Sequence, residues 1–371
     1  MFLAVREIRR AKARFALLVT AVSLLTFLIL VQQALQNGLI TGFVGAIRTQ
    51  SAPVLVYSVD GQRTLQGSVV EPALALAIAR VPGVAATAPI AQRTFTASVN
   101  GGDASNAALF AYRDAALGGP GSLTAGRLPR RAGEAVGSAQ DFALGDQVRI
   151  LGPGSSPTIT VVGLAADAQI QVTPTLFVGW SDLAAASRAV NPDAGAMLPG
   201  AIAARPVAGV SAATLAQRIN AALPQADALT RSQAAEKTPG VAQVRQSFQL
   251  IFALFALVVP LVTGLFFLIV TFQKSRSLTL LHAIGAEPRR LLSSLLLQVF
   301  AIVGGGIALG TLLYAPLSQT TVGSLVLRFD PRSVLIWAAL LLGLGVLSAM
   351  VAARRVLRID PVEATTGGGG R

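Results

Sequence analysis

The sequence predicts a membrane α-helical protein with four transmembrane helices, one before and three after a large α+β extracytoplasmic domain. Four long stretches contain no Asp, Glu, Lys or Arg, and they are Phe15–Leu35, Gln246–Gln273, Leu291–Leu327 and Ser333–Ala353. A helix rises about 1.5 Å per residue, so about 20 apolar residues cross the hydrocarbon layer, and each stretch is long enough. Charged residues make up only 13% of the chain, against about 25% in soluble domains.

The positions of the basic residues predict the orientation. The net charge is +13, but residues 1–14, 274–290 and 354–371 together carry 13 Lys or Arg against 4 Asp or Glu. The segment 36–247 is nearly balanced, with 15 basic against 12 acidic residues. Lys and Arg beside a span mark its cytoplasmic side and contact anionic lipid. We therefore expect a multi-pass protein of the cell (inner or plasma) membrane with both termini cytoplasmic, residues 37–245 extracytoplasmic and no nucleic-acid partner.

The first span is expected to be a retained anchor, because its apolar run is longer than the 7–15 residues of a signal-peptide core. Before it, apolar residues alternate with five basic ones, which favours an interfacial amphipathic helix over a topology signal without fixed structure. The predicted order is 1–14 interfacial helix, 15–36 first span, 37–245 α+β domain, 246–273 second span, 274–290 cytoplasmic loop, 291–317 third span, 318–332 short external loop, 333–353 fourth span and 354–371 cytoplasmic tail.

The segment between the first two spans alternates strand-like and helix-like pieces. β-Branched runs predict strands, and the sequence EPALALAIARVPG predicts a helix that starts near Pro72 and stops at Pro82-Gly83. A second helix is expected after Ser211, with Leu215, Ile219 and Ala222 on one face. The other expected strands lie at Thr94–Asn100, Ala107–Tyr112, Gln147–Leu151, Thr158–Leu164 and Thr175–Val178. This pattern indicates an α+β domain and leaves open a division into two subdomains.

Two features of the expected spans concern their packing. Pro260 and Gly264 lie midway along the second span and predict a kink. Gly306 and Gly310 form a G-x-x-x-G spacing in the third span, which allows close helix approach. The spacing fits a dimer contact and also packing within the chain against the second or fourth span.

The sequence lacks the residues of several kinds of active site. It has no cysteine, one histidine (His282), no G-x-x-x-x-G-K-[ST] phosphate-binding loop and no G-x-S-x-G elbow. We therefore expect neither catalytic residues, metal nor cofactor in this chain. The spans also contain no ionisable side chain, although ion-coupled carriers need such groups at membrane depth.

The loop before the third span, KSRSLTLLHAIGAEPRRLLSSLLLQ, resembles that of MacB/FtsX-like ABC transporter permeases, the type VII or mechanotransmission class. In that family a short helix ending in A-I-G-A is followed by basic residues. The N-terminal LAVREIRRAKARFALL and the C-terminal AARRVLRIDPVEAT are similar to the family's ends, as is the order of one span, a large MacB-like domain and three spans. The loop departs from the family at Ser277, Thr279 and His282, where an acidic residue, a glycine and an arginine are usual.

The resemblance implies a permease that does not hydrolyse ATP itself. A separate cytoplasmic ABC ATPase, which holds ATP and Mg²⁺, docks on the loop, two permease chains pair, and the extracytoplasmic domains move. The residues implied in ATPase coupling are Leu280, Leu281, His282, Ala283, Ile284, Gly285, Ala286, Arg289 and Arg290. Large apolar side chains in an aqueous loop need a partner surface, which argues against a plain connector.

The expected function is export or extraction of a hydrophobic or amphipathic substrate. The alternative is an ATPase-driven signalling subunit that activates an envelope enzyme. A homodimer is preferred and a heterodimer stays open, and so does a further extracytoplasmic partner, whether an adaptor, a lipoprotein or a hydrolase.

Overall fold

A computed structural model of the chain describes residues 12–153, 156–193, 195–258, 261, 265, 288–318, 321–322, 325–326 and 331–357. It divides into a unit of long apolar helices and an α+β domain that spans Asn37–Gln246 and includes the short ribbon Thr321–Val326. Most of the expected interfacial helix, both residues of the expected kink, most of the cytoplasmic loop and most of the tail lie outside the described residues.

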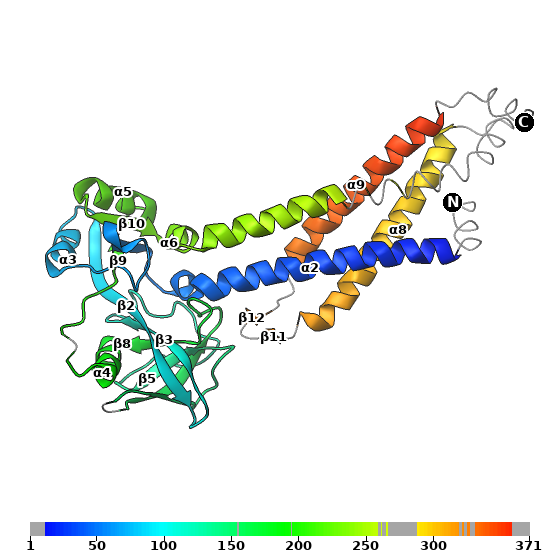
Figure 1. Cartoon of the computed structure of the whole chain (residues 1–371). Coiled ribbons are helices and arrows are strands. Elements are labelled where there is room, and N and C mark those ends of the chain that lie inside the picture. Colours follow the sequence, from blue (N-terminus) through cyan, green and yellow to red (C-terminus); the bar gives the residue numbers. More distant parts are fainter. Residues whose placement is uncertain are drawn as a thin grey trace, which may run out of the picture. The chain divides into compact units, whose positions relative to one another are not determined.

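The helical unit contains α2 (Lys12–Thr49), a helix over Val241–Val258, α8 (Pro288–Leu317) and α9 (Pro331–Leu357) (Figure 1). Three described segments are long and apolar enough to cross a membrane, namely Phe15–Thr49, Val241–Val258 and Leu296–Leu317. In α9 the apolar part found is the shorter Val334–Leu344, so the fourth span stays a prediction.

Apolar side chains hold this unit together. Phe15, Val22 and Ile29 of α2 are buried in one cluster with residues of α8 and α9, among them Val303 and Leu341. Side chains three, four or seven positions apart share one face of a helix, which explains the spacing of the three α2 residues. The boundary between the two units falls inside α2, which continues without a break in helical assignment to Thr49, beyond the expected end of the first span at residue 36.

The α+β domain is built on one large sheet. Its strands follow the order β10-β1-β9-β2-β3-β8-β5-β7-β4, and β6 pairs with β2 and β7. All described pairs are antiparallel except β3 with β8 and β5 with β7. The bounds are β1 Val54–Ser58, η1 Val59–Gly61, α3 Pro72–Ala79, β2 Val84–Val99, β3 Ala104–Tyr112, β4 Ala125–Gly126, β5 Glu134–Ser138, β6 Gln147–Ile150, β7 Thr158–Ala165, β8 Thr175–Gly179, α4 Trp180–Val190, β9 Ala201–Pro206, α5 Ala212–Ala222, β10 Ala226–Thr230, α6 Arg231–Lys237, β11 Thr321–Val322 and β12 Leu325–Val326.

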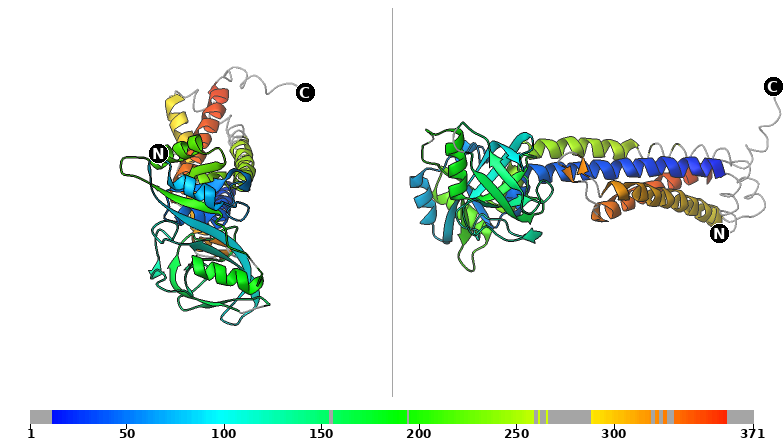
Figure 2. Two further views of the ribbon diagram at one scale, coloured as in Figure 1. Left: turned by 90° about the vertical axis from the view of Figure 1, so that its left-hand side faces the viewer. Right: turned by 90° about the horizontal axis from the view of Figure 1, so that it is seen from below.

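Strand β2 joins two regions of the sheet. Its first half pairs with β9, where α3 and α5 pack over β1, β9 and β10. Its second half pairs with β3 and β6, where α4 packs on a separate cluster. The two helix-covered regions are apparent in Figures 1 and 2, and because they share β2 the sheet runs through both.

The observed elements correct three sequence-based expectations. β2 begins at Val84, ten residues before the expected Thr94, since a second pairing partner extends it. On α5, Leu215 and Ile219 are buried as expected but Ala222 is exposed and Ala216 is buried in its place. Ala222 is the last residue of α5, where the chain leaves the face that packs on the sheet. The helices α4 and α6 were not among the expected elements.

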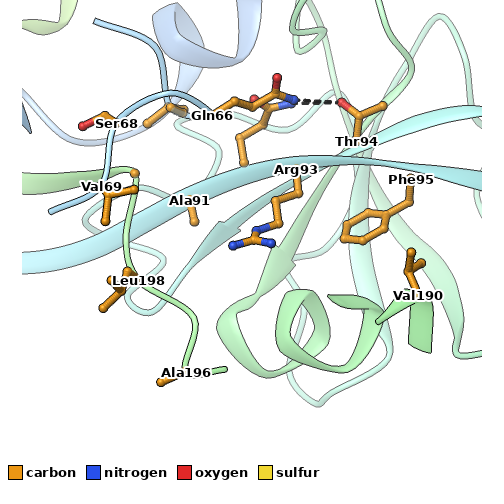
Figure 3. A pocket seen from close by; sticks show the side chains of 13 residues that line it. Gln66, Ser68, Val69, Ala91, Arg93, Thr94, Phe95, Val190, Ala196 and Leu198 are labelled. Atoms are coloured by element: carbon orange, nitrogen blue, oxygen red, sulfur yellow. Dashed lines mark hydrogen bonds between the residues drawn. The ribbon is translucent and has the colours of Figure 1, made fainter. Parts of the chain in front are cut away.

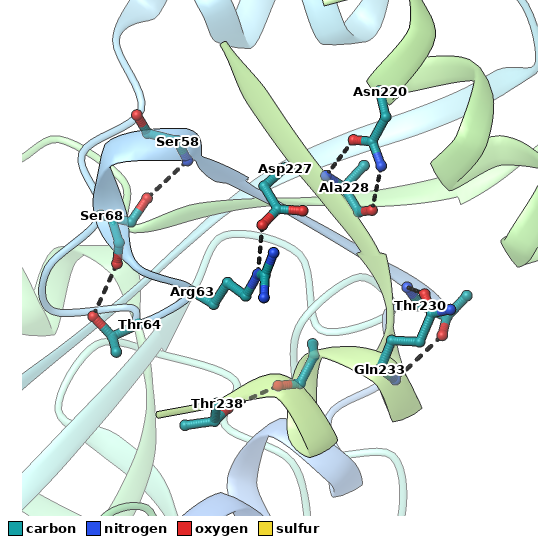
Figure 4. Close-up of polar contacts among 12 residues, drawn as sticks. Ser58, Arg63, Thr64, Ser68, Asn220, Asp227, Ala228, Thr230, Gln233 and Thr238 are labelled. Carbon is teal, nitrogen blue, oxygen red and sulfur yellow. Dashed lines mark hydrogen bonds and ion pairs between the residues drawn. The ribbon is translucent and has the colours of Figure 1, made fainter. Parts of the chain in front are cut away.

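Polar side chains close the outer edge at β10. Asn220 of α5 donates to the carbonyl of Ala228 at 2.9 Å and accepts from its amide at 2.7 Å (Figure 4). The side-chain amide therefore takes the place of a further strand on this edge, which blocks pairing with another chain. On the same strand Asp227 pairs with Arg63 at 2.6 Å.

A second ion pair holds the turn before β5. Glu134 accepts from both terminal nitrogens of Arg127, at 2.7 and 2.8 Å, from Arg131 at 3.0 Å and from the Arg130 amide at 2.9 Å. Its side chain is only 5% exposed, against 20% for Asp227. The hydrogen bonds from Arg127, followed by that from the Arg130 amide, hold the pKa of Glu134 far below its usual range.

We predict that Glu134→Gln lowers the thermal unfolding midpoint of the full chain in detergent near neutral pH, because it removes the charge from this pair. A carboxylate whose pKa is lower in the folded than in the unfolded state stabilises the folded state at pH values above the ordinary glutamate pKa of about 4.3. The advantage of the natural residue should therefore shrink as the pH falls below that value toward the folded pKa. Asp227→Asn is the matched control and should change the midpoint little, since an exposed pair contributes about 0–1 kcal/mol. A pH-independent difference would contradict this account.

Candidate functional site

The residues expected to couple to an ATPase are not brought together by the described structure. Leu280, Leu281, His282, Ala283, Ile284, Gly285 and Ala286 all lie outside the described residues. Arg289 and Arg290 lie in the first turn of α8, which begins at Pro288, a favoured first helical residue. The coupling assignment therefore stays a prediction.

The small residues of α8 pack against α2. A Cβ atom on Gly306 would lie 2.5 Å from a methyl group of Val22, and one on Gly310 would lie 2.5 Å from the carbonyl oxygen of Ser23. Only glycine permits this approach, because real Cβ contacts are not that short. The G-x-x-x-G face thus packs within the chain, and its partner is the first span rather than the second or fourth.

The last turns of α2 are buried in the core of the α+β domain. Val44, Ala46 and Ile47 are at most 2% exposed and belong to one cluster with residues of β1, β3 and β8. The same cluster includes Ala235 of α6 and Val241, which begins the next long helix. Both long helices are therefore anchored in a single core where they enter this domain.

A loop between β7 and β8 bonds directly to the backbone of α2. The Ala46 amide donates to the carbonyl of Gln169 at 2.8 Å, and the Gly42 carbonyl accepts from the amide of Val172, also at 2.8 Å. The amide of Gln171 adds a bond of 3.0 Å to the Phe43 carbonyl. We call the residues 42–49 of α2 together with the loop 167–172 the joint.

The loop of the joint has unusual backbone angles. Asp167, Gln171 and Val172 have φ values of 54°, 53° and 56°. Positive φ is uncommon outside glycine and is a clear outlier for a β-branched residue such as Val172. A methyl group on Gly45 would overlap the carbonyl oxygen of Asp167, so helix and loop are in close backbone contact. The Thr173 amide donates to the carbonyl of Ile170 at 3.0 Å, so Gln171 and Val172 are the two central residues of a tight turn.

A buried network of polar side chains around Asp141 holds the loop of the joint in place. Gln169 is 1% exposed and donates to both carboxylate oxygens of Asp141, at 2.9 and 2.8 Å. Ser138 also donates to Asp141 and accepts from the amide of Thr175 at 3.2 Å. Burial raises the pKa of Asp141, and the hydrogen bonds from Ser138 and Gln169 oppose that shift. The network connects the joint to strands β5 and β8.

Helix α6, which precedes the long helix that begins at Val241, is hydrogen-bonded to the chain just after α2. Arg231, the first residue of α6, donates from its side chain to the carbonyl of Gln50 at 2.9 Å and from its amide to Pro53 at 3.0 Å. Thr230 and Gln233 cap α6 reciprocally (Figure 4). The end of α2 and the start of α6 therefore form one hydrogen-bonded structure.

The joint contains no group of residues that suggests catalysis. Among the described residues, no three His, Cys, Asp or Glu side chains gather in a way that could hold a metal ion. What the geometry offers is mechanical, namely a long helix whose end is bonded through its own backbone to a domain core.

We predict that Gly310→Ala destabilises the helical unit by about 1–3 kcal/mol, the usual cost of overpacking a close contact. The new methyl group would meet the backbone of α2 at Ser23, which cannot move aside as a side chain could. Gly304→Ala is the control, because nothing lies within 4 Å of a Cβ atom there. Thermal unfolding in detergent should show a lower midpoint for Gly310→Ala alone. Equal midpoints for both variants would show that the helices do not pack this way.

Comparison with known proteins finds similarity in the C-terminal part of the chain. Residues 250–361 match the family described as FtsX-like permease C-terminal. A Staphylococcus epidermidis protein named for a hemin transport system permease, HrtB, is 29% identical over 112 residues, which are 30% of this chain and 32% of the relative. The HrtB of Staphylococcus haemolyticus is 28% identical over 110 residues, 30% and 31% of the two chains. The aligned part thus spans about a third of the curated relatives.

Two solved structures give weaker likenesses. The periplasmic region of MacB from Actinobacillus actinomycetemcomitans is 12% identical with a TM-score of 0.35, and the match covers 50% of this chain and 91% of that one. The extracellular domain of the transporter YknZ from Gram-positive bacteria is 12% identical with a TM-score of 0.31, and the match covers 48% and 98%. The match over residues 250–361 confirms the resemblance to FtsX-like permeases that the sequence predicted.

Proposed function

We propose that this chain, in which residues 250–361 are an FtsX-like permease C-terminal domain, is the membrane permease subunit of an ABC transporter that works by mechanotransmission. A separate cytoplasmic ATPase binds and hydrolyses ATP with Mg²⁺. This chain converts the closure of that ATPase into movement of its α+β domain, which we place outside the membrane. The substrate is then exported or extracted without a hydrophilic path through the spans.

The observation that carries the mechanical part is the bonding of α2 at the joint. With 38 residues, α2 is about 57 Å long at 1.5 Å per residue, more than the hydrocarbon layer of about 30 Å. A continuous helix of this length transmits a tilt or shift of the span to its far end. At that end the backbone bonds at Gly42, Phe43 and Ala46 connect it to the loop and to the domain core.

The loop couples the end of α2 to the sheet. The Gly42 carbonyl and the Ala46 amide both bond to it. A helix movement that displaces these bonds would reposition β7 and β8, which the loop connects, and so move the part of the sheet covered by α4.

The remaining parts of the assembly follow from the family resemblance. We propose four spans with both termini in the cytoplasm, and two permease chains, preferably identical, with two ATPases. The staphylococcal relatives are named for hemin transport, but the alignment covers only 30% of this chain. We therefore propose a hydrophobic or amphipathic substrate as a class.

We predict that Val172→Pro uncouples the α+β domain from α2. Proline removes the amide that bonds to Gly42 and cannot adopt the φ of 56°. The lost bond and altered loop should cost about 1–3 kcal/mol at the joint. A spin label at Asp103→Cys, on an exposed hairpin of this cysteine-free chain, reports the distance between the two α+β domains of a permease pair. ATP should change that distance in the natural chain but little in Val172→Pro.

Val172→Gly is the matched control for this experiment. Glycine keeps the amide and accepts positive φ without strain, so the ATP-dependent distance change should persist. An unchanged response in Val172→Pro would remove the joint from the mechanism, while ATP hydrolysis by the complex should continue in both variants.

The second prediction concerns the cytoplasmic loop. If Leu281, Ile284 and Gly285 seat in a cleft of the ATPase, then Ile284→Asp should abolish co-purification of the ATPase, because burying an unpaired carboxylate costs several kcal/mol. The permease itself should still insert and fold. Thr279→Asp is the control, since its spacing places it on a different helical face, and it should be milder. Full retention of the ATPase by Ile284→Asp would leave the loop a passive connector.

A further inference from the structure

An open cavity lies in the α+β domain, away from the joint. It is bounded by β2, by the segment after η1 and by the end of α4 with the loop that leads to β9. Its volume is about 530 Å³, within the range of about 300–1,000 Å³ that is usual for small-molecule sites. The coupling mechanism proposed above makes no use of it.

The lining of the cavity is mixed, and part of it consists of large apolar side chains that are exposed. Val69, Val190 and Leu198 line it and are 52%, 41% and 38% exposed. They come from three separate segments of the chain, yet they face the same space. Large apolar side chains gathered around a concavity mark a binding surface more often than scattered exposed ones do.

A cation lies among these walls. The side chain of Arg93 extends from β2 between Leu198 on one side and Phe95 and Val190 on the other (Figure 3). The described residues form three ion pairs, and Arg93 takes part in none of them. A planar guanidinium without a carboxylate partner can bind an anionic head group through two hydrogen bonds.

The hydroxyl of Thr94, the next residue of β2, lies on the opposite face of the strand from Arg93 (Figure 3). It accepts a hydrogen bond from the amide nitrogen of Gln66 at 3.0 Å and another from Gln92 at 3.3 Å. Gln92 is only 2% exposed, so its position is fixed by packing. Thr94 therefore belongs to a polar group with Gln66 and Gln92, separate from Arg93, which lies among the apolar side chains (Figure 3).

We propose that this cavity binds an amphiphilic anion, with its carboxylate or phosphate head on Arg93 and its apolar body against Val69, Val190 and Leu198. As a statement about the substrate class, this rests on the proposed function. The binding itself requires only this chain.

Equilibrium dialysis of carbon-14 decanoate against the full chain in nanodiscs, with empty nanodiscs subtracted, tests the site. We expect saturable binding that Arg93→Gln weakens at least about tenfold, the loss expected for a charge-assisted hydrogen bond. Arg149→Gln is the matched control, because it removes the same charge from an exposed position outside the cavity and should leave binding unchanged. Val190→Asp should weaken binding as well, through repulsion of the anion and a more polar wall.

Further arms identify the head group. Decanol lacks the charge, so it should bind more weakly than decanoate and respond equally little to both arginine variants. Decyl phosphate distinguishes a phosphate from a carboxylate head, and Arg93-dependent binding of either anion supports the site. Equal binding by Arg93→Gln and Arg149→Gln, or no saturable binding of either anion, would overturn it. No ATPase is present in this assay, so such a result would leave the permease proposal standing.

Discussion

The joint depends on one constraint, which is that buried backbone amides and carbonyls must be paired. The last turns of α2 enter a domain core where water cannot satisfy them, and the loop 167–172 supplies part of the pairing. Val172 supplies one of these bonds from a tight turn in which it and Gln171 have positive φ. Gly45 allows the close approach, because any side chain there would collide with the loop. The helix end, the loop and the buried network around Asp141 are therefore linked by one continuous set of hydrogen bonds.

In the helical unit, small residues allow the helices to pack closely. Lipid tails are as apolar as leucine, so helices in a membrane associate through close packing rather than through hydrophobic burial. Gly306 and Gly310 allow α8 to contact the backbone of α2. The apolar side chains that remain exposed on these helices are left for lipid or for a second chain.

The sequence predicts the large features because they follow from simple patterns. Uncharged stretches locate the long helices, and β-branched runs locate β3, β6, β7 and β8 to within a few residues. The joint could not be predicted, since the bonds between α2 and the loop 167–172 join segments that are far apart in the sequence. The cavity escaped prediction for a similar reason, because Val69, Arg93 and Leu198 meet only after the sheet has formed. The ATPase-coupling residues 280–286 are the opposite case, because they are predicted from the sequence pattern alone and lie outside the described residues.

The order of strands in the sheet also bears on how the domain is made. Among the described strands, β1 pairs only with β9 and β10. The pairing partner of Val54 in β9 is Ala204, which lies 150 positions later in the sequence. In the orientation proposed above, a chain that crosses the membrane in sequence order would expose β1 unpaired until nearly the whole domain had emerged. Only then could the C-terminal strands pair beside it and the last turns of α2 become buried. In that orientation, export and folding of this domain would finish together, with α6 and the following helix arriving last.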